Sequence, residues 1–304
     1  MATVTAAPTP PTAATTTTPP RKATFASRAV QAAGRGPLHL ILVLIALYWL
    51  VPTIGLAFTS LRTNEANSST GWWTALTEPS QLTLDNYLAL LDNSRITDSL
   101  FNTVLITVPT TVLVVVVAAL AAYALAWVRF PGRDWVFLLV IGLLVVPLQV
   151  ALIPVAEIFG NLGIFGTITS VILFHVAFGL PFAVFLLRNF FVGIPRELLE
   201  AARIDGAGEL RIFFRVVMPI AVPAIASLAI FQFLWTWNDL LVGLVFAESA
   251  NAPITVAIRE QTRRFGGNID IIAPGAFISL VIPLAVFFAF QRYFVQGILA
   301  GSEK

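Results

Sequence analysis

The sequence predicts an all-α integral membrane protein with six transmembrane helices. Of its 304 residues, 58% are hydrophobic and 11% are charged, whereas soluble domains are about 45–50% apolar and roughly 25% charged. The mean hydropathy is +0.87. Six apolar stretches approach the roughly 20 residues that a helix needs to cross the hydrocarbon core, and basic residues concentrate in alternate loops.

The six expected spans are 38–60, 100–128, 134–156, 166–192, 217–246 and 271–297. Residues 1–36 are rich in Ala, Thr and Pro, a composition that cannot bury enough apolar surface to fold alone. They predict a disordered cytoplasmic leader before a transmembrane domain at 37–304. An outer loop at 61–99 has room for a short interfacial helix, and a charged loop occupies 193–216.

The Lys and Arg residues predict that both ends of the chain are cytoplasmic. With the N-terminus inside, thirteen of the 18 basic residues fall on the cytoplasmic side, as expected for inner loops. The remaining five are Arg62, Arg95, Arg259, Arg263 and Arg264.

Several kinds of chemistry are excluded by residue content. The chain has no Cys, its two His residues have no HExxH spacing, and its two Lys residues allow no GxxxxGK[ST] phosphate loop. The net charge of +2 does not indicate a nucleic-acid partner. We therefore expect a protein that is not an enzyme and binds no cofactor or metal, and that does not hydrolyse nucleotide through such a loop.

The charged loop predicts a short helix from Pro195 to Asp205. Proline is tolerated in a first helical turn, Glu197 lies near the positive end of the helix dipole, and Gly206 follows where the helix should end. A small apolar stripe falls on one side: Leu198, Leu199 and Ala202. A helix on the lipid surface is one interpretation. The balance of acids and bases favours a protein partner instead.

This loop contains a long spaced motif. Glu200, Ala201 and Ala202 are followed after three residues by Gly206, and after nine more by "VVMP", which ends at Pro219. The motif resembles the EAA signature of permease subunits of ATP-binding cassette importers. "LTLDNYLALL", "SLFNTVLI" and "FLWTWNDLLVGLVF" also resemble the carbohydrate branch, similar to the second maltose permease subunit.

The resemblance implies a type I importer permease fold in a bacterial cytoplasmic membrane. It implies a heterodimer with a second permease, two copies of a cytoplasmic ATPase that holds ATP and magnesium, and an extracytoplasmic sugar-binding protein. It also assigns coupling to the ATPase to a set of loop residues: Glu200, Ala201, Ala202, Arg203, Asp205, Gly206 and Pro219.

Polar and aromatic residues in the fifth span are candidates for a sugar path. Gln232, Trp235 and Asp239 share one helix face, and amide, carboxylate and ring groups together suit a sugar. Further candidates are Trp237, Asn238 and, in the third span, Gln149; His175 is a weaker one. The alternative is that the tryptophans form an interfacial belt while Asn238 and Asp239 cap the helix.

A stand-alone secondary transporter or channel is the alternative function. Such carriers often show inverted repeats and buried coupling charges. No clear repeat is present here, and the only carboxylates in or beside the spans that suit ion coupling are Asp239 and Glu157.

Overall fold

The computed structural model describes residues 25–262 and 268–300, with side chains at 36–262 and 268–292. These residues form helices and no β-strand. The helices are α1 Phe25–Leu61, α2 Asn64–Ser69, η1 Trp72–Leu76, η2 Pro79–Gln81, α3 Asp85–Asp92, α4 Ser94–Trp127, α5 Arg133–Leu143, α6 Leu148–Asn161, α7 Ile168–Val192, α8 Arg196–Ile204, α9 Glu209–Ile212, η3 Phe213–Val217, α10 Met218–Trp237, α11 Leu241–Phe246, η4 Ser249–Asn251, α12 Ile254–Thr262 and α13 Ile269–Ala300.

The chain divides into two units, residues 1–53 and 54–304. In the first unit α1 begins at Phe25, so residues 25–36, which the sequence predicts to lie in the leader, are helical in the structure. The segment "FASRAVQAA" explains the difference, because Ala, Arg and Gln are strong helix formers. Residues 1–24 of the expected leader lie outside the described residues.

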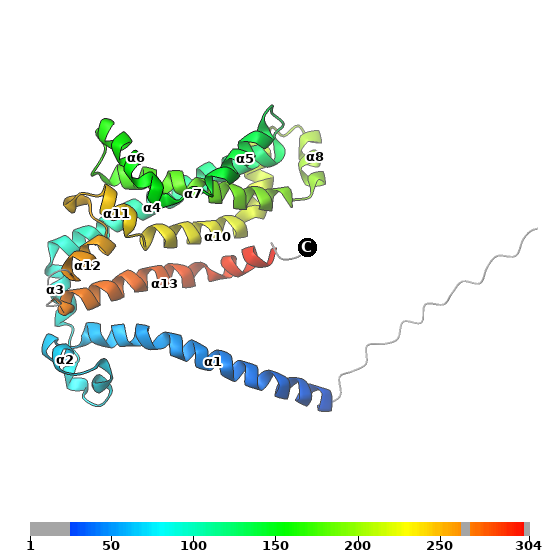
Figure 1. The fold of residues 1–304 in the computed structure, drawn as a ribbon. Helices are drawn as coiled ribbons and strands as arrows, with labels where there is room; N and C mark the ends of the chain where they lie inside the picture. Colours follow the sequence, from blue (N-terminus) through cyan, green and yellow to red (C-terminus); the bar gives the residue numbers. More distant parts are fainter. Residues whose placement is uncertain (1–24, 263–267, 301–304) are drawn as a thin grey trace, which may run out of the picture. The chain divides into compact units, whose positions relative to one another are not determined.

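The second unit is built on four long helices, α4, α7, α10 and α13 (Figure 1). Helix α4 packs against α7 and α10, and α10 also packs against α13. The largest apolar core lies where α4, α7 and α10 meet α8 and α9, and it includes Val114, Leu187, Leu199 and Phe213. Many other Leu, Val and Phe side chains of these helices are exposed, as lipid-facing or subunit-facing residues would be.

The third expected span is not one straight helix. Helices α5 and α6 meet at a bend of 104°, the geometry of a broken span or of a re-entrant loop, and the described part of the chain has five other helices long and apolar enough to cross a membrane. Pro147 takes the N-cap position of α6. Proline lacks an N–H donor and disfavours helical geometry in the residue before it, so the chain turns here.

The fifth expected span, 217–246, also has different bounds. One continuous helical segment runs from Glu209 to Trp237, and residues 241–246 form the separate helix α11. The segment contains a π-helical turn at Phe213–Val217, directly before Pro219. A proline ring clashes with the carbonyl four residues earlier, and the wider π turn accommodates it.

The outer loop, in which the sequence left room for a short interfacial helix, contains several short elements. It holds α2, two 3-10 turns and α3, arranged around the buried side chain of Arg62. Arg62 donates to the Gln81 side chain at 3.0 Å and to the carbonyl oxygens of Ala66 at 2.8 Å and Thr70 at 3.1 Å. A buried guanidinium with this many acceptors fixes the fold of a short segment that has little apolar core.

Candidate functional site

Helix α8 confirms the short helix predicted in the charged loop. Pro195 is its N-cap, Glu197 lies in its first turn and Asp205 is its C-cap. Gly206 has φ +78°, a left-handed conformation that glycine adopts without strain. Its N–H donates to Arg203 O and the N–H of Ala207 donates to Ala202 O, both at 3.0 Å. These two bonds form a Schellman motif, which ends the helix sharply.

The apolar residues of α8 face in two directions, not one as the predicted stripe required. Leu199 is 0% exposed and lies in the largest core, where the partly buried Ala202 also packs. Leu198 and Ala201 are exposed, and Ile204 is 86% exposed. The protein's own helices therefore hold one side of α8, while its outer side keeps an apolar surface that none of the described residues covers.

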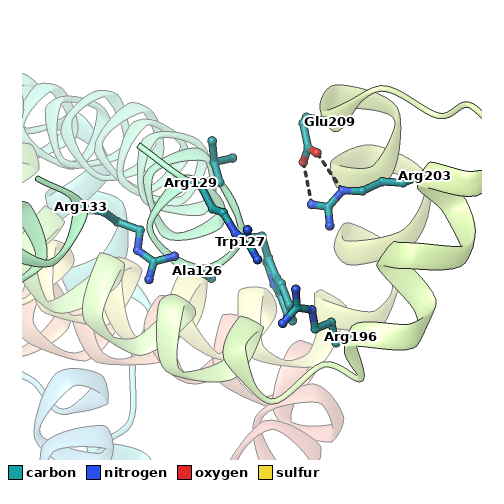
Figure 2. A pocket seen from close by; sticks show the side chains of 8 residues that line it. Ala126, Trp127, Arg129, Arg133, Arg196, Arg203 and Glu209 are labelled. Atoms are coloured by element: carbon teal, nitrogen blue, oxygen red, sulfur yellow. Dashed lines mark hydrogen bonds and ion pairs between the residues drawn. The ribbon is translucent and has the colours of Figure 1, made fainter. Parts of the chain in front are cut away.

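Glu209 is a functional candidate that the sequence reasoning missed. Its carboxylate accepts a hydrogen bond of 2.5 Å from the Tyr123 hydroxyl of α4 and one of 3.0 Å from Arg203 Nε; Figure 2 shows the Arg203 contact. Arg203, which the resemblance assigned to the ATPase, is thus paired within the chain. This hydrogen bond is the main cause that raises the pKa of Arg203 above its ordinary value. Tyr123, Arg203 and Glu209 together tie the end of α8 to α4. The sequence gave no signal for the Arg203–Glu209 pair, because the two residues are six positions apart on either side of a glycine turn.

The remaining coupling candidates are solvent-accessible. Glu200 accepts a hydrogen bond of 2.8 Å from Arg196 one turn earlier, and both side chains are more than half exposed. Asp205 and Gly206 are exposed at the end of α8, and Pro219 is exposed in the first turn of α10. A partner that approaches this end of the bundle can reach all of them.

Two of the predicted path residues lie together in a groove between α7 and α10. The groove has a volume of about 310 Å³, and its lining is mostly aromatic: Phe178, Gly179, Phe182, Leu228, Phe231, Gln232 and Trp235. Gln232 donates to Thr236 Oγ1 at 3.1 Å. Trp235 is 38% exposed and packs 5.3 Å from the ring of His175. The groove combines ring faces with one amide.

The other residues of this group have structural contacts. Trp237 is 1% exposed and donates to Ser279 O of α13 at 3.0 Å, so it belongs to the core. Asn238 donates to Leu234 O at 2.8 Å, and Asp239 accepts from the N–H of Val242 at 2.9 Å. Asn238 and Asp239 therefore cap helix ends, as the alternative interpretation stated.

Neither His175 nor Gln149 lines the groove, although the His175 ring packs against Trp235. The Nε2 atom of buried His175 is 3.7 Å from Asp239 Oδ2, which joins α7 to the residue that caps α11. Gln149 is exposed near the start of α6, after the bend. Among the described residues no three His, Asp or Glu side chains are grouped as a metal site would need.

The long apolar helices, their exposed apolar surfaces and the charged helix α8 define a polytopic membrane protein. A family model described as "binding-protein-dependent transport system inner membrane component" matches residues 95–299. The chain belongs to this family of membrane transport components.

Two relatives and one solved structure are similar to this chain. It is 46% identical to the osmoprotective compounds uptake permease protein GgtD of Synechocystis sp. over 88% of the chain and 92% of the relative. It is 48% identical to the alpha-glucoside transport system permease protein AglG of Rhizobium meliloti over 75% of the chain and 62% of the relative. A bacterial ABC transporter involved in the import of the acidic polysaccharide alginate matches with a TM-score of 0.71 at 21% identity, over 89% of this chain and 98% of that one. That match shows the fold.

Proposed function

We propose that this chain is a permease subunit of an ATP-driven importer of sugars or oligosaccharides in the bacterial cytoplasmic membrane. Its partners are a second permease, two copies of an ATPase that binds ATP and magnesium, and an extracytoplasmic sugar-binding protein. The family description supports the binding protein and the inner membrane. The name of one relative, which refers to alpha-glucoside transport, supports an importer of sugars or oligosaccharides, and the name of the other refers to uptake of osmoprotective compounds.

The observation that carries this proposal is the two-sided packing of α8. Leu199 is buried in the bundle, whereas Leu198, Ala201 and Ile204 leave an apolar surface outside it. An exposed apolar face rimmed by charges is typical of a protein interface. The distribution of basic residues supports cytoplasmic chain ends, and on that orientation this face meets the ATPase and α8 is the coupling helix. Closure of the ATPase then moves α8 and drives alternating access as a rigid-body motion.

The groove between α7 and α10 is the part of the sugar path that this chain contributes. Its aromatic rings can stack on the apolar faces of a sugar ring, and the Gln232 amide can hydrogen-bond to hydroxyl groups. Polar groups in a membrane helix usually face a bundle interior or an aqueous cavity, which fits a groove that the second permease would complete. Trp237 and Asn238 support the helices around it.

Uptake of radiolabelled sugar by the reconstituted transporter tests the coupling role. Glu200→Lys should abolish uptake and sugar-stimulated ATP hydrolysis. The matched control is Glu197→Lys, which makes the same charge change one turn earlier on the same exposed helix and should keep most of the uptake. Equal uptake by the two variants would contradict the role of Glu200.

Gly206 provides a second variant that separates backbone strain from crowding. No atom lies within 4 Å of a Cβ added at Gly206, so only its φ of +78° opposes a side chain. We expect Gly206→Val to abolish uptake and Gly206→Asn, which tolerates this conformation, to keep part of it. A stand-alone carrier or channel makes a different prediction, because the purified chain would then transport without an ATPase.

A further inference from the structure

A basic pocket lies between the turn that joins α4 to α5 and the start of α8. It is separate from the groove and has a volume of about 510 Å³. Four arginines and one glutamate carry its charge, and a tryptophan forms part of its wall: Arg129, Arg133, Arg196, Arg203, Glu209 and Trp127. In Figure 2 Arg133 and Arg196 lie on either side of Trp127.

The pocket carries excess positive charge. Arg203 is neutralised inside the pocket by Glu209, whereas the partners of Arg133 and Arg196 among the described side chains, Asp134 and Glu200, are more than half exposed. Arg129 has no ion pair within the described part of the chain. Exposed ion pairs contribute little free energy, so an anion that enters the pocket can compete for these guanidinium groups.

The local backbone adds to this charge and fixes the wall. Arg133 is the first residue of α5 and Arg196 is the first residue of α8, so two positive helix ends lie beside the pocket. Trp127 donates its indole N–H to Phe191 O at 3.1 Å, which holds its ring between α4 and α7. The pocket is therefore a defined site in the fold and not a chance gathering of long side chains.

An apolar surface continues from the pocket along α5. Trp135 is 76% exposed, and Leu138 and Leu139 beside it are also exposed. A neighbouring cavity of about 370 Å³ shares Arg129 and Arg133 with the pocket and reaches Trp135. Exposed tryptophan is typical of the membrane–water interface, and basic pockets beside transmembrane helices suit lipid headgroups.

We propose that this pocket binds the headgroup phosphate of an anionic phospholipid, whose acyl chains lie along the exposed face of α5. A free phosphate would use the arginines but not the apolar surface next to them. The bound headgroup joins the α4–α5 turn to the first turn of α8, so the lipid also braces the helix that meets the partner subunit. This site is independent of which substrate the transporter carries.

Native mass spectrometry of the full chain in a neutral detergent tests the proposal. Dioleoyl phosphatidylglycerol should bind more tightly than dioleoyl phosphatidylcholine. The double variant Arg129→Gln/Arg133→Gln should weaken phosphatidylglycerol binding about thirtyfold, because each basic residue near an anionic lipid contributes roughly a factor of five. Binding of phosphatidylcholine should not change.

The matched control is Arg211→Gln/Arg215→Gln, which removes two exposed arginines outside the pocket and should bind phosphatidylglycerol as the unmodified chain does. Arg129→Lys/Arg133→Lys keeps the charge, and its affinity for phosphatidylglycerol should stay within about threefold of that of the unmodified chain. This variant also shows that substitution at these two positions does not itself unfold the protein. Equal weakening in the pocket and control variants would overturn the site. Displacement of the lipid by inorganic phosphate or by glycerophosphoglycerol at similar concentrations would overturn the lipid assignment.

Discussion

The hydrogen bonds of Glu209 predict how firmly α8 is held to the bundle. The carboxylate accepts a hydrogen bond from Tyr123 at 2.5 Å and two from Arg203 at 3.0 and 3.4 Å. A hydrogen bond to a charged group contributes about 1.5–3 kcal/mol, and a partly exposed ion pair adds at most about 1 kcal/mol. We therefore expect Glu209→Ala to lower the free energy of local opening of α8 by about 2 kcal/mol.

Hydrogen exchange of the α8 amides in the purified full chain measures this change. A loss of 2 kcal/mol corresponds to roughly thirtyfold faster exchange, since about 1.4 kcal/mol is a factor of ten. Tyr123→Phe removes one of the bonds, which contributes about 1.5 kcal/mol, and should speed exchange by about tenfold. In the Glu209→Ala background Tyr123→Phe should add nothing, because the hydroxyl has already lost its acceptor.

Glu200→Ala is the control for this experiment. It also removes a glutamate that pairs with an arginine, but Glu200 and Arg196 both lie on α8 and are largely exposed. An exposed pair of this spacing contributes about 0.3–0.5 kcal/mol, so exchange should rise only about twofold. If Glu209→Ala and Glu200→Ala change exchange equally, Glu209 does not anchor α8 and the reasoning is refuted.

Three further predictions concern packing and caps. Leu199→Ala should lower the free energy of unfolding by about 2–4 kcal/mol, as for other buried leucines, whereas Ile204→Ala should leave the melting temperature unchanged and reduce uptake only. Gly179→Ala places a Cβ 2.6 Å from Gln232 Oε1, so it should destabilise the chain by about 1 kcal/mol, and adding Gln232→Ala should remove that penalty on thermal unfolding. Asp239→Ala leaves two N–H groups at the start of α11 without their acceptor, so amide exchange at 242–246 should quicken by about fivefold; unchanged exchange would contradict the capping role.

Local signals in the sequence were sufficient to predict where the long helices lie and where α8 begins and ends. Hydropathy located the long helices, and Pro195 with Gly206 located both ends of the charged helix, because a capping proline and a left-handed glycine act within a few residues. Hydropathy alone was not sufficient at residues 144–147. Both sides of Pro147 are equally apolar, so an average over the window hid the turn that the proline makes.

The burial of individual site residues was not predicted, because it depends on contacts between residues that are distant in sequence. Trp237 looked like a path residue, but it is buried in the structure and donates its indole N–H to Ser279 O on α13. Leu198 and Leu199 are neighbours with the same side chain, but Leu199 is buried in the largest core whereas Leu198 is 45% exposed. No pattern within a single helix encodes such a choice.

The two candidate sites lie at opposite ends of one continuous helical segment. It begins at Glu209, which is bonded to Arg203 of α8 and to Tyr123 of α4, and it ends at Trp237. Near its far end it carries Gln232 and Trp235 of the groove. The twenty residues of α10 alone span roughly 30 Å. The π turn at Phe213–Val217 and the prolines Pro219 and Pro223 interrupt the regular hydrogen bonding near the start of the segment, but the segment stays helical throughout. Under the proposed function, a displacement of α8 therefore reaches the groove along one continuous helical segment, and no chain of side-chain contacts across the bundle is required.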